Sequence, residues 1–118
     1  MQLKDLSNEL ALAKKAAKDA GLLLVNSRNQ LNKELHSNPK DIKLQADIES
    51  EILIKKIIKK SSDYPILAEE SGKSDSDLGE TFWVIDPLDG TANYKRKIPV
   101  CCVSIALVKE MKPILGVI

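Results

Sequence analysis

The chain has 118 residues, of which 43% are hydrophobic, and this share is enough to form the core of one ordinary domain. Lys and Arg number 18 against 17 Asp and Glu, so the formal net charge of +1 lacks the basic excess that nucleic-acid binding needs. No apolar stretch reaches the roughly 18 residues of a membrane span, and the polar start does not resemble a signal peptide. We therefore expect a cytoplasmic globular protein with no nucleic-acid or membrane partner.

The first part of the chain predicts a long amphipathic helix, because apolar residues recur at intervals of three and four over residues 3–24. The stripe consists of Leu3, Leu6, Leu10, Ala13, Ala17, Ala20 and Leu24. A coiled coil has the same spacing, but the short run and the poor charge order favour packing within the chain. The pattern then fades over residues 26–41, where Ser37, Asn38 and Pro39 are turn residues, so a connection is predicted there.

A second helix is predicted to begin near Ala46 or Asp47 and to end at Lys59 and Lys60, whose charges suit a helix C-terminus. Its apolar residues cover more than one face, which predicts burial on two sides. These residues are Ile48, Ile52, Leu53, Ile54, Ile57 and Ile58.

The rest of the chain contains short apolar runs bounded by turn residues, which predict strands at 65–68, 82–85, 100–108 and 113–118. The last two runs are joined by residues 109–112, a length that suits an antiparallel hairpin. The adjacent cysteines within this region, Cys101 and Cys102, are expected to be reduced core residues, because adjacent cysteines strain a disulfide and fit no zinc spacing.

Two helices followed by strands predict an α+β domain. In this arrangement two long N-terminal helices pack on a largely antiparallel sheet.

Acidic residues are concentrated near the middle of the chain. Residues 63–89 hold eight carboxylates against one basic residue, Lys73, which is a local net charge of −7. Asp75, Asp77 and Glu80 lie in the polar run 71–80 and are expected in a solvated, mobile loop.

Glu69, Asp86 and Asp89 differ from the loop residues because they lie at the ends of apolar runs, where a partly desolvated carboxylate needs a counter-charge. Pro87 keeps Asp86 extended, and the turn at Gly90 brings Asp86 and Asp89 together. Oxygen donors with no neighbouring Lys or His favour a hard cation, Mg²⁺ rather than zinc. A structural acidic turn is the alternative.

Residues 91–95 follow this turn and are typical of the first turn of a helix, whose free N–H groups bind phosphate. Carboxylates for a metal next to an anion-binding helix start are what metal-assisted hydrolysis of a phosphate ester requires, because the cation neutralises the phosphate and acidifies the attacking water. Spacing alone leaves both interpretations open, since short Asp-Gly motifs also arise by chance.

Two motifs resemble a known family. Residues 67–71, Leu-Ala-Glu-Glu-Ser, and residues 83–94, Trp-Val-Ile-Asp-Pro-Leu-Asp-Gly-Thr-Ala-Asn-Tyr, resemble the paired signature of the inositol monophosphatase family of Mg²⁺-dependent, lithium-sensitive phosphatases. The resemblance implies the N-terminal part of a layered sugar-phosphatase fold and hydrolysis of a small polyol or sugar phosphate. Activity like that of a 3'(2'),5'-bisphosphate nucleotidase or a fructose-1,6-bisphosphatase is the alternative within the family.

The same resemblance implies the metal ligands. The side chains of Glu69, Asp86 and Asp89 and the backbone carbonyl of Leu88 would hold Mg²⁺, with Asp86 bridging two ions.

It also implies roles around the substrate. Thr91 and Asp47 would orient and activate the attacking water, and Glu69 is counted with them as catalytic. Asp89 and the backbone of Gly90 and Thr91 would bind the phosphorylated substrate, while Glu70 would support the metal ligands.

The chain departs from the family pattern in three ways. Leu44 stands where a Thr is usual, which puts the hydrogen bonding of Asp47 in doubt, and His36 stands where a Lys is common. Family members are also much longer, and their C-terminal half supplies another Asp ligand and most substrate contacts. Residues 1–118 are thus expected to be an N-terminal α+β domain with the C-terminal half absent. It would be either a piece of a longer phosphatase or an inactive truncated domain that binds metal weakly or forms a homodimer.

Overall fold

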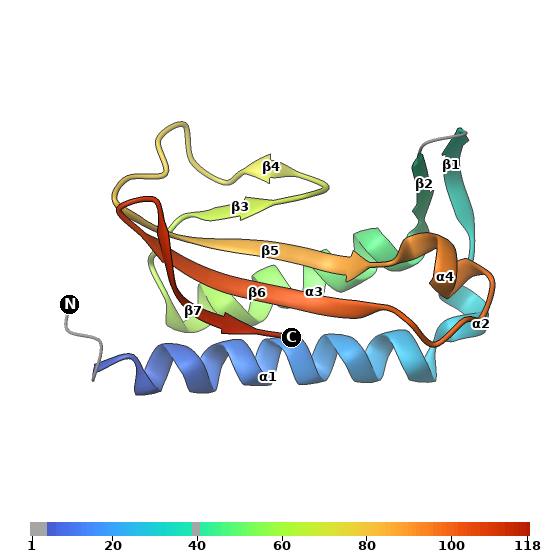
Figure 1. Ribbon diagram of the computed structural model, residues 1–118, viewed down its shortest axis with the longest axis horizontal. Coiled ribbons are helices and arrows are strands. Elements are labelled where there is room, and N and C mark those ends of the chain that lie inside the picture. The colour runs from blue at the N-terminus through green and yellow to red at the C-terminus, as the bar shows by residue number, and fades with distance from the viewer. Residues whose placement is uncertain (1–4, 39–40) are drawn as a thin grey trace.

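Two long helices lie on one face of a five-stranded sheet in the computed structural model, which describes residues 5–38 and 41–118 (Figure 1). The helices are α1 (Ser7–Asn26) and α3 (Gln45–Ser61). The other elements are α2 (Arg28–Leu31), β1 (Glu34–Asn38), β2 (Asp41–Leu44), β3 (Ile66–Ala68), β4 (Gly72–Lys73), β5 (Thr81–Asp89), α4 (Thr91–Lys95), β6 (Cys102–Lys109) and β7 (Lys112–Val117). The predicted α+β class and both long helices are confirmed.

The sheet has the strand order β4-β3-β5-β6-β7. Neighbouring strands are antiparallel except for β3 and β5, which are parallel, so the prediction of a largely antiparallel sheet is confirmed. The predicted hairpin is formed by β6 and β7. β5 continues past the predicted run 82–85, and its register against β6 shifts between Asp86 and Asp89. Such a shift bends a strand and re-aims its side chains.

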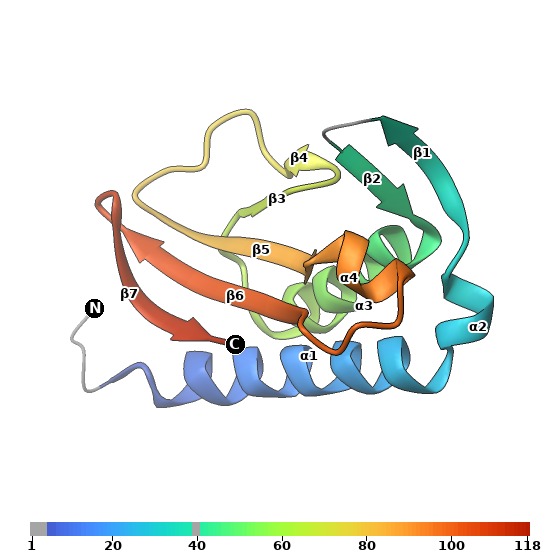
Figure 2. The ribbon, with the colours of Figure 1, turned by 45° about the vertical axis from the view of Figure 1, so that its right-hand side comes forward.

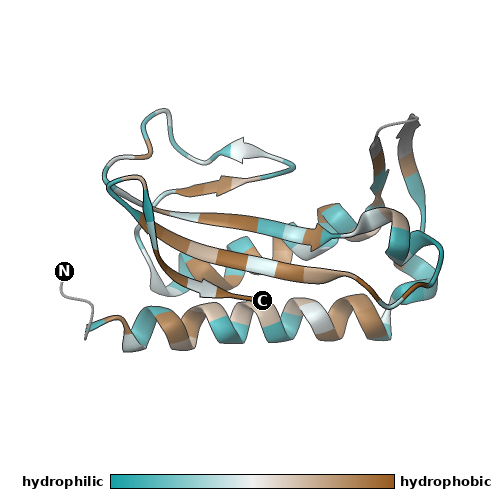
Figure 3. Cartoon of the chain, in the orientation of Figure 1, coloured by the Kyte–Doolittle hydropathy of each residue, from teal (hydrophilic) through white to brown (hydrophobic). Residues whose placement is uncertain are grey.

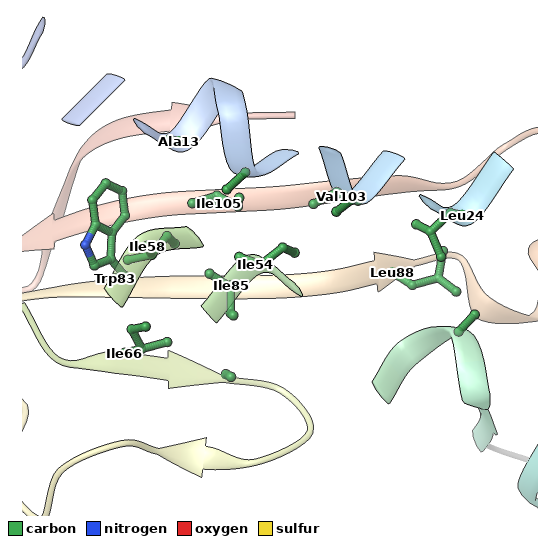
Figure 4. Close-up of a cluster of buried hydrophobic side chains, with 14 of the residues drawn as sticks. Ala13, Leu24, Ile54, Ile58, Ile66, Trp83, Ile85, Leu88, Val103 and Ile105 are labelled. Atoms are coloured by element: carbon green, nitrogen blue, oxygen red, sulfur yellow. The ribbon is translucent and has the colours of Figure 1, made fainter. Parts of the chain in front are cut away.

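The core lies between the two helices and the sheet, and Figure 4 shows side chains from both helices and from β5 and β6 meeting there. Ala13 and Ala20 of α1 are fully buried, and so is Trp83 of β5. Ala16 is buried as well, and Ala17 of the predicted stripe is partly buried against the core, so the buried face of the helix is wider than the stripe. Hydrophilic residues alternate with apolar ones along α1 (Figure 3), and Leu22 and Val25 near its C-terminal end are exposed. Leu3 and Pro39 lie outside the described residues.

Residues 26–41 were predicted to be a connection, and this is wrong. They contain α2 and, with residues 42–44, the antiparallel pair β1 and β2. Within this hairpin, apolar residues alternate only over the four residues of β2, where Ile42 and Leu44 face the core, and Leu35 of β1 is 52% exposed. Its strands are held by backbone pairing and by contacts with residues far along the chain, which leave no periodic signal.

The prediction that both cysteines lie in the core is also wrong, since Cys101 is exposed and Cys102 is partly exposed. β6 begins at Cys102, so the start of the apolar run 100–108 lies outside the sheet. Both thiols are free, as predicted. Among the helices of the described residues, none is long and apolar enough to cross a membrane.

Candidate metal and phosphate site

The candidate site lies at one end of the sheet, where β5 runs into α4 and where α3 begins (Figure 2). Parallel pairing places the C-terminal ends of β3 and β5 side by side, with Ala68 opposite Ile85. The next residue on each strand is an acid, Glu69 after β3 and Asp86 within β5. The backbone N–H of Glu69 donates to the Ile85 carbonyl at 3.3 Å, which continues the pairing by one residue.

The carboxyl groups of Glu69 and Asp86 face each other. The hydrogen bond that the protonated Glu69 carboxyl donates to Asp86 is the main cause that raises the pKa of Glu69 to about 7, and burial and the charge of Asp86 add to it. Two facing carboxylates are stable only if a proton or a cation lies between them. The two carboxyls therefore share a site that favours a proton or a cation, and they present oxygen donors on one side of the sheet end.

The end of β5 is fixed to α3 and to itself. Asp86 Oδ1 accepts the backbone N–H of Leu88 at 3.2 Å, across Pro87, which has no N–H to donate. The carbonyl of Pro87 accepts the hydroxyl of Ser50, a fully buried residue of α3, at 2.7 Å. The turn at Asp86 is thus held from both sides, which fixes the direction of its carboxylate.

A second carboxylate, Asp47, lies in the first turn of α3 and is 2% exposed. Its Oδ2 accepts the backbone N–H of Leu44 at 2.8 Å, and its Oδ1 accepts the hydroxyl of Thr91 at 2.9 Å. The Thr91 hydroxyl also lies 3.2 Å from the carbonyl of Leu88. Burial raises the pKa of Asp47, while the hydrogen bonds from Leu44 and Thr91 oppose that shift.

Leu44 stands where the family usually has a Thr, and the structure shows how this change affects the hydrogen bonding of Asp47. A capping pair normally has a hydroxyl residue at the N-cap, which bonds the backbone of the third helical residue. Leu44 has no oxygen for that bond, but its own backbone N–H still reaches Asp47. The Thr-to-Leu change therefore removes one half of the capping pair and leaves the hydrogen bond to Asp47 in place.

The turn between β5 and α4 requires a glycine at position 90. Gly90 has φ +90°, and a Cβ there would lie 2.8 Å from the carbonyl oxygen of Val100. α4 starts at the next residue and leaves its first N–H groups without partners inside the helix.

α4 is fastened from behind by Tyr94. The buried Tyr94 donates its hydroxyl to the carbonyl of Leu24 at 2.7 Å. The guanidinium of Arg28 donates to the carbonyl of Tyr94 at 2.9 Å and lies 4.7 Å from the centre of its ring. The helix start that faces the acidic residues is therefore fixed to α1 and α2.

The third expected ligand, Asp89, is exposed, and its Oδ2 lies 3.9 Å from the thiol of Cys102. Burial and the Asp89 carboxylate raise the pKa of that thiol, so it stays protonated and can donate. Within residues 5–38 and 41–118, no three His, Cys, Asp or Glu side chains lie close enough together to hold a metal ion.

The donor set nevertheless fits a hard cation in its chemistry. The paired carboxyls of Glu69 and Asp86, the carbonyl of Leu88 and the carboxylate of Asp89 are all oxygen donors at one end of the sheet. Oxygen donors of this kind suit Mg²⁺ better than zinc.

Two residues near the site had not been singled out. The sequence led us to expect no lysine near the acidic residues, but Lys43 of β2 lies 2.7 Å from the carboxylate of Glu70. Ser50 likewise contacts the Asp86 turn through Pro87. A small polar residue on an apolar helix face was the one available signal for Ser50. For Lys43 there was none, because its strand was predicted as a connection.

Comparisons with known proteins agree with this fold. A model described as the inositol monophosphatase family matches residues 5–118. An inositol-1-monophosphatase of Synechocystis is 44% identical over 79 residues, covering 66% of this chain and 28% of that protein. A fructose-1,6-bisphosphatase/inositol-1-monophosphatase of Aquifex aeolicus is 37% identical over 119 residues, covering 98% and 45%. The crystal structure of the SuhB protein of Bartonella henselae superposes with a TM-score of 0.83 at 32% identity, covering 93% and 44%.

The chain thus shares the α+β fold of these relatives. The chain belongs to the inositol monophosphatase family, whose members are phosphatases. It spans less than half the length of these relatives.

Proposed function

We propose that this chain forms the metal- and phosphate-binding part of a Mg²⁺-dependent phosphomonoesterase that acts on a small polyol or sugar phosphate. The observation that supports this most is the facing pair of carboxyls, Glu69 and Asp86, beside the turn at Gly90. Family membership makes hydrolysis of a phosphorylated small molecule the reaction to expect.

In this proposal Glu69, Asp86 and Asp89, with the carbonyl of Leu88, hold the metal. When bound, a divalent cation neutralises phosphate charge and lowers the pKa of a coordinated water. The backbone amides of Gly90 and Thr91 bind phosphate oxygens.

Asp47 and Thr91 would handle the proton of the attacking water. The Thr91 hydroxyl donates its own proton to Asp47 Oδ1, so its lone pairs are available to accept a hydrogen bond from that water. Asp47 is buried, and its raised pKa suits it to accept a proton relayed through Thr91.

The identity of the ester is part of the proposal. The Aquifex aeolicus relative carries both fructose-1,6-bisphosphatase and inositol-1-monophosphatase in its name and matches 98% of this chain. A sugar bisphosphate is therefore the second candidate, and a bisphosphate nucleotide is a further alternative. We also propose that residues 1–118 are the N-terminal part of the site, that a C-terminal half completes it, and that the protein is a cytoplasmic homodimer.

Calorimetric titration with Mg²⁺ and a phosphate-release assay on inositol monophosphate and fructose 1,6-bisphosphate test the proposal. We expect this chain alone to bind Mg²⁺ weakly and to show little or no turnover. Asp86→Asn should abolish the binding, because one of the two facing carboxylates is lost. Asp77→Asn is the matched control, since Asp77 is exposed and accepts only the nearby N–H of Gly79 in the described contacts.

Equal Mg²⁺ binding by Asp86→Asn and the unchanged chain would contradict the proposed site. Robust hydrolysis by this chain alone would contradict the view that further residues are needed. Complete absence of metal binding would also contradict the proposed site.

A further inference from the structure

We propose that Lys43 is a positioning residue of the metal site, holding the Glu69–Glu70 turn against the strand that carries Asp86. The inference rests on the proposed function. The Lys43 ammonium lies 2.7 Å from Glu70 Oε2, and the Glu70 side chain is 10% exposed against 34% for Lys43. A carboxylate this sheltered depends on its cation more than a surface carboxylate does.

The turn after β3 is held along its whole length. The backbone N–H of Glu69 donates to β5, and that of Glu70 donates to the buried carboxylate of Glu51 on α3 at 2.9 Å. The hydroxyl of Ser71 accepts from Lys55 at 2.9 Å in an exposed contact. These contacts hold the backbone of Glu69 and Glu70 and the exposed hydroxyl of Ser71. Lys43, in contrast, forms an ion pair with the Glu70 carboxylate itself.

Lys43 comes from the hairpin of β1 and β2, which lies next to α4 at the end of the sheet that holds the candidate site (Figure 2). On its other side, Glu34 at the start of β1 pairs with Lys95 of α4 at 2.9 Å, with both side chains more than a third exposed. The hairpin is thus linked by ion pairs to the segment that carries Glu69 and to the helix that begins the phosphate-binding turn. The sheltered Lys43–Glu70 pair is the stronger of the two links.

The charge of Glu70 explains why its placement matters. Glu70 adds to the negative charge felt by both Glu69 and Asp47. With Lys43 in place, the Glu70 carboxylate is neutralised and held by β2. Without Lys43, it would be a third carboxylate free to turn toward the Glu69–Asp86 pair, and the geometry that receives a cation would be lost.

A charge-swap cycle tests the inference, with Mn²⁺ alone as the probe and its binding followed by electron paramagnetic resonance. We expect Lys43→Glu and Glu70→Lys each to weaken Mn²⁺ binding about tenfold, as outer-shell changes commonly do. The double variant should recover most of the loss. Net charge alone predicts the opposite pattern, in which Lys43→Glu strengthens binding, Glu70→Lys weakens it and the two effects add.

Amide hydrogen exchange gives a second readout that needs no metal. Both single variants should speed exchange in the Glu69–Ser71 turn and in β2, and the double variant should slow it again. Lys109→Glu is the control for charge, because Lys109 pairs at 3.9 Å with Glu80 at the far end of the sheet. It should leave exchange in the turn unchanged.

Additive effects with opposite signs on Mn²⁺ binding, or unchanged exchange in all variants, would overturn the role of Lys43. If the unchanged chain binds no Mn²⁺, the proposed function fails, and the exchange cycle alone decides whether Lys43 holds the turn.

Discussion

The candidate site has two parts, which differ in whether the chain itself supplies hydrogen-bond donors to their carboxylates. In the first, which we call the Asp47 corner, the buried carboxylate of Asp47 accepts hydrogen bonds from Leu44 and Thr91, and Thr91 also contacts Leu88. In the second, the carboxyl pair, Glu69 and Asp86 face each other, and the causes found for the Glu69 pKa among the described residues all raise it.

This difference separates what folding builds from what a ligand must supply. Each oxygen of Asp47 has a donor from the chain itself, so the corner is complete without a metal. The carboxyl pair gains stability only from a bound proton or a cation, because two negative charges at hydrogen-bond distance repel each other. Removing a carboxylate should therefore destabilise the corner and stabilise the metal-free pair, which the following variants test.

The largest effect is expected for Gly90→Ala, because Gly90 sets the turn that brings Thr91 to the Asp47 corner. An alanine there would adopt an unfavourable φ of +90°, and its Cβ would lie 2.8 Å from the Val100 carbonyl oxygen. We expect a loss of about 3 kcal/mol in the free energy of unfolding. Urea unfolding followed by circular dichroism measures it.

Gly79→Ala is the matched control for this variant. Gly79 has φ +69°, but a Cβ there would have nothing within 4 Å. Its expected loss is about 1 kcal/mol, from the backbone conformation alone. Equal losses for the two variants would show that the close approach at Gly90 contributes nothing.

Asp47→Ala should have the next largest effect. It leaves the Leu44 N–H and the Thr91 hydroxyl without their carboxylate at a position that is 2% exposed. We expect a loss of about 2 kcal/mol in the free energy of unfolding, both with and without Mg²⁺. Asp77→Ala, which removes an exposed carboxylate, should change stability by less than about 0.5 kcal/mol. An unchanged stability of Asp47→Ala would remove the distinction between the two parts of the site.

Much of this fold could be predicted because its signals are periodic. The apolar stripe of residues 3–24 and the runs of 65–68 and 82–85 correspond to α1, β3 and β5. The hairpin β1–β2 could not be predicted in this way. Its strands are short, alternation is confined to the four residues of β2, and the hairpin also makes tertiary ion pairs such as Glu34–Lys95, whose partners lie 61 residues apart.

The candidate site residues came from strand ends and from a resemblance between motifs, and both signals are local. These two signals identified Glu69 and Asp86, and the parallel pairing of β3 and β5 brings the two residues together. They missed Lys43, because an ion pair across the fold has no sequence spacing. They also did not predict that Asp89 is exposed and lies 3.9 Å from the thiol of Cys102.

A smaller effect is expected for Ser50→Ala, which concerns the link between the two parts. Ser50 lies on the same helix as Asp47, and its buried hydroxyl donates to the Pro87 carbonyl next to Asp86. Its removal should cost about 1 kcal/mol in the free energy of unfolding. Ser76→Ala, at an exposed loop position, is the control and should have almost no effect. If Ser50→Ala is as stable as the unchanged chain, the link between α3 and β5 does not depend on this hydrogen bond.

The smallest effect, and the one with the opposite sign, is expected for Glu69→Gln. The pKa of Glu69 is raised from 4.5 to about 7 in the folded chain, mainly by its hydrogen bond with Asp86. Between these two values the folded state binds more protons than the unfolded state, so the metal-free chain should lose stability as the pH rises from 5 to 8. Glu69→Gln should reduce this pH dependence and melt slightly higher than the unchanged chain at pH 8 in the presence of a chelator.

Mg²⁺ should raise the melting temperature of the unchanged chain at pH 8 and should have less effect on Glu69→Gln. Since Glu69 is largely exposed, solvent screening keeps the shift small, and thermal melts at several pH values are needed to resolve it. If the melting temperatures of the two proteins change with pH in the same way, repulsion between Glu69 and Asp86 does not destabilise the metal-free chain. The contrast with the Asp47 corner would then fail.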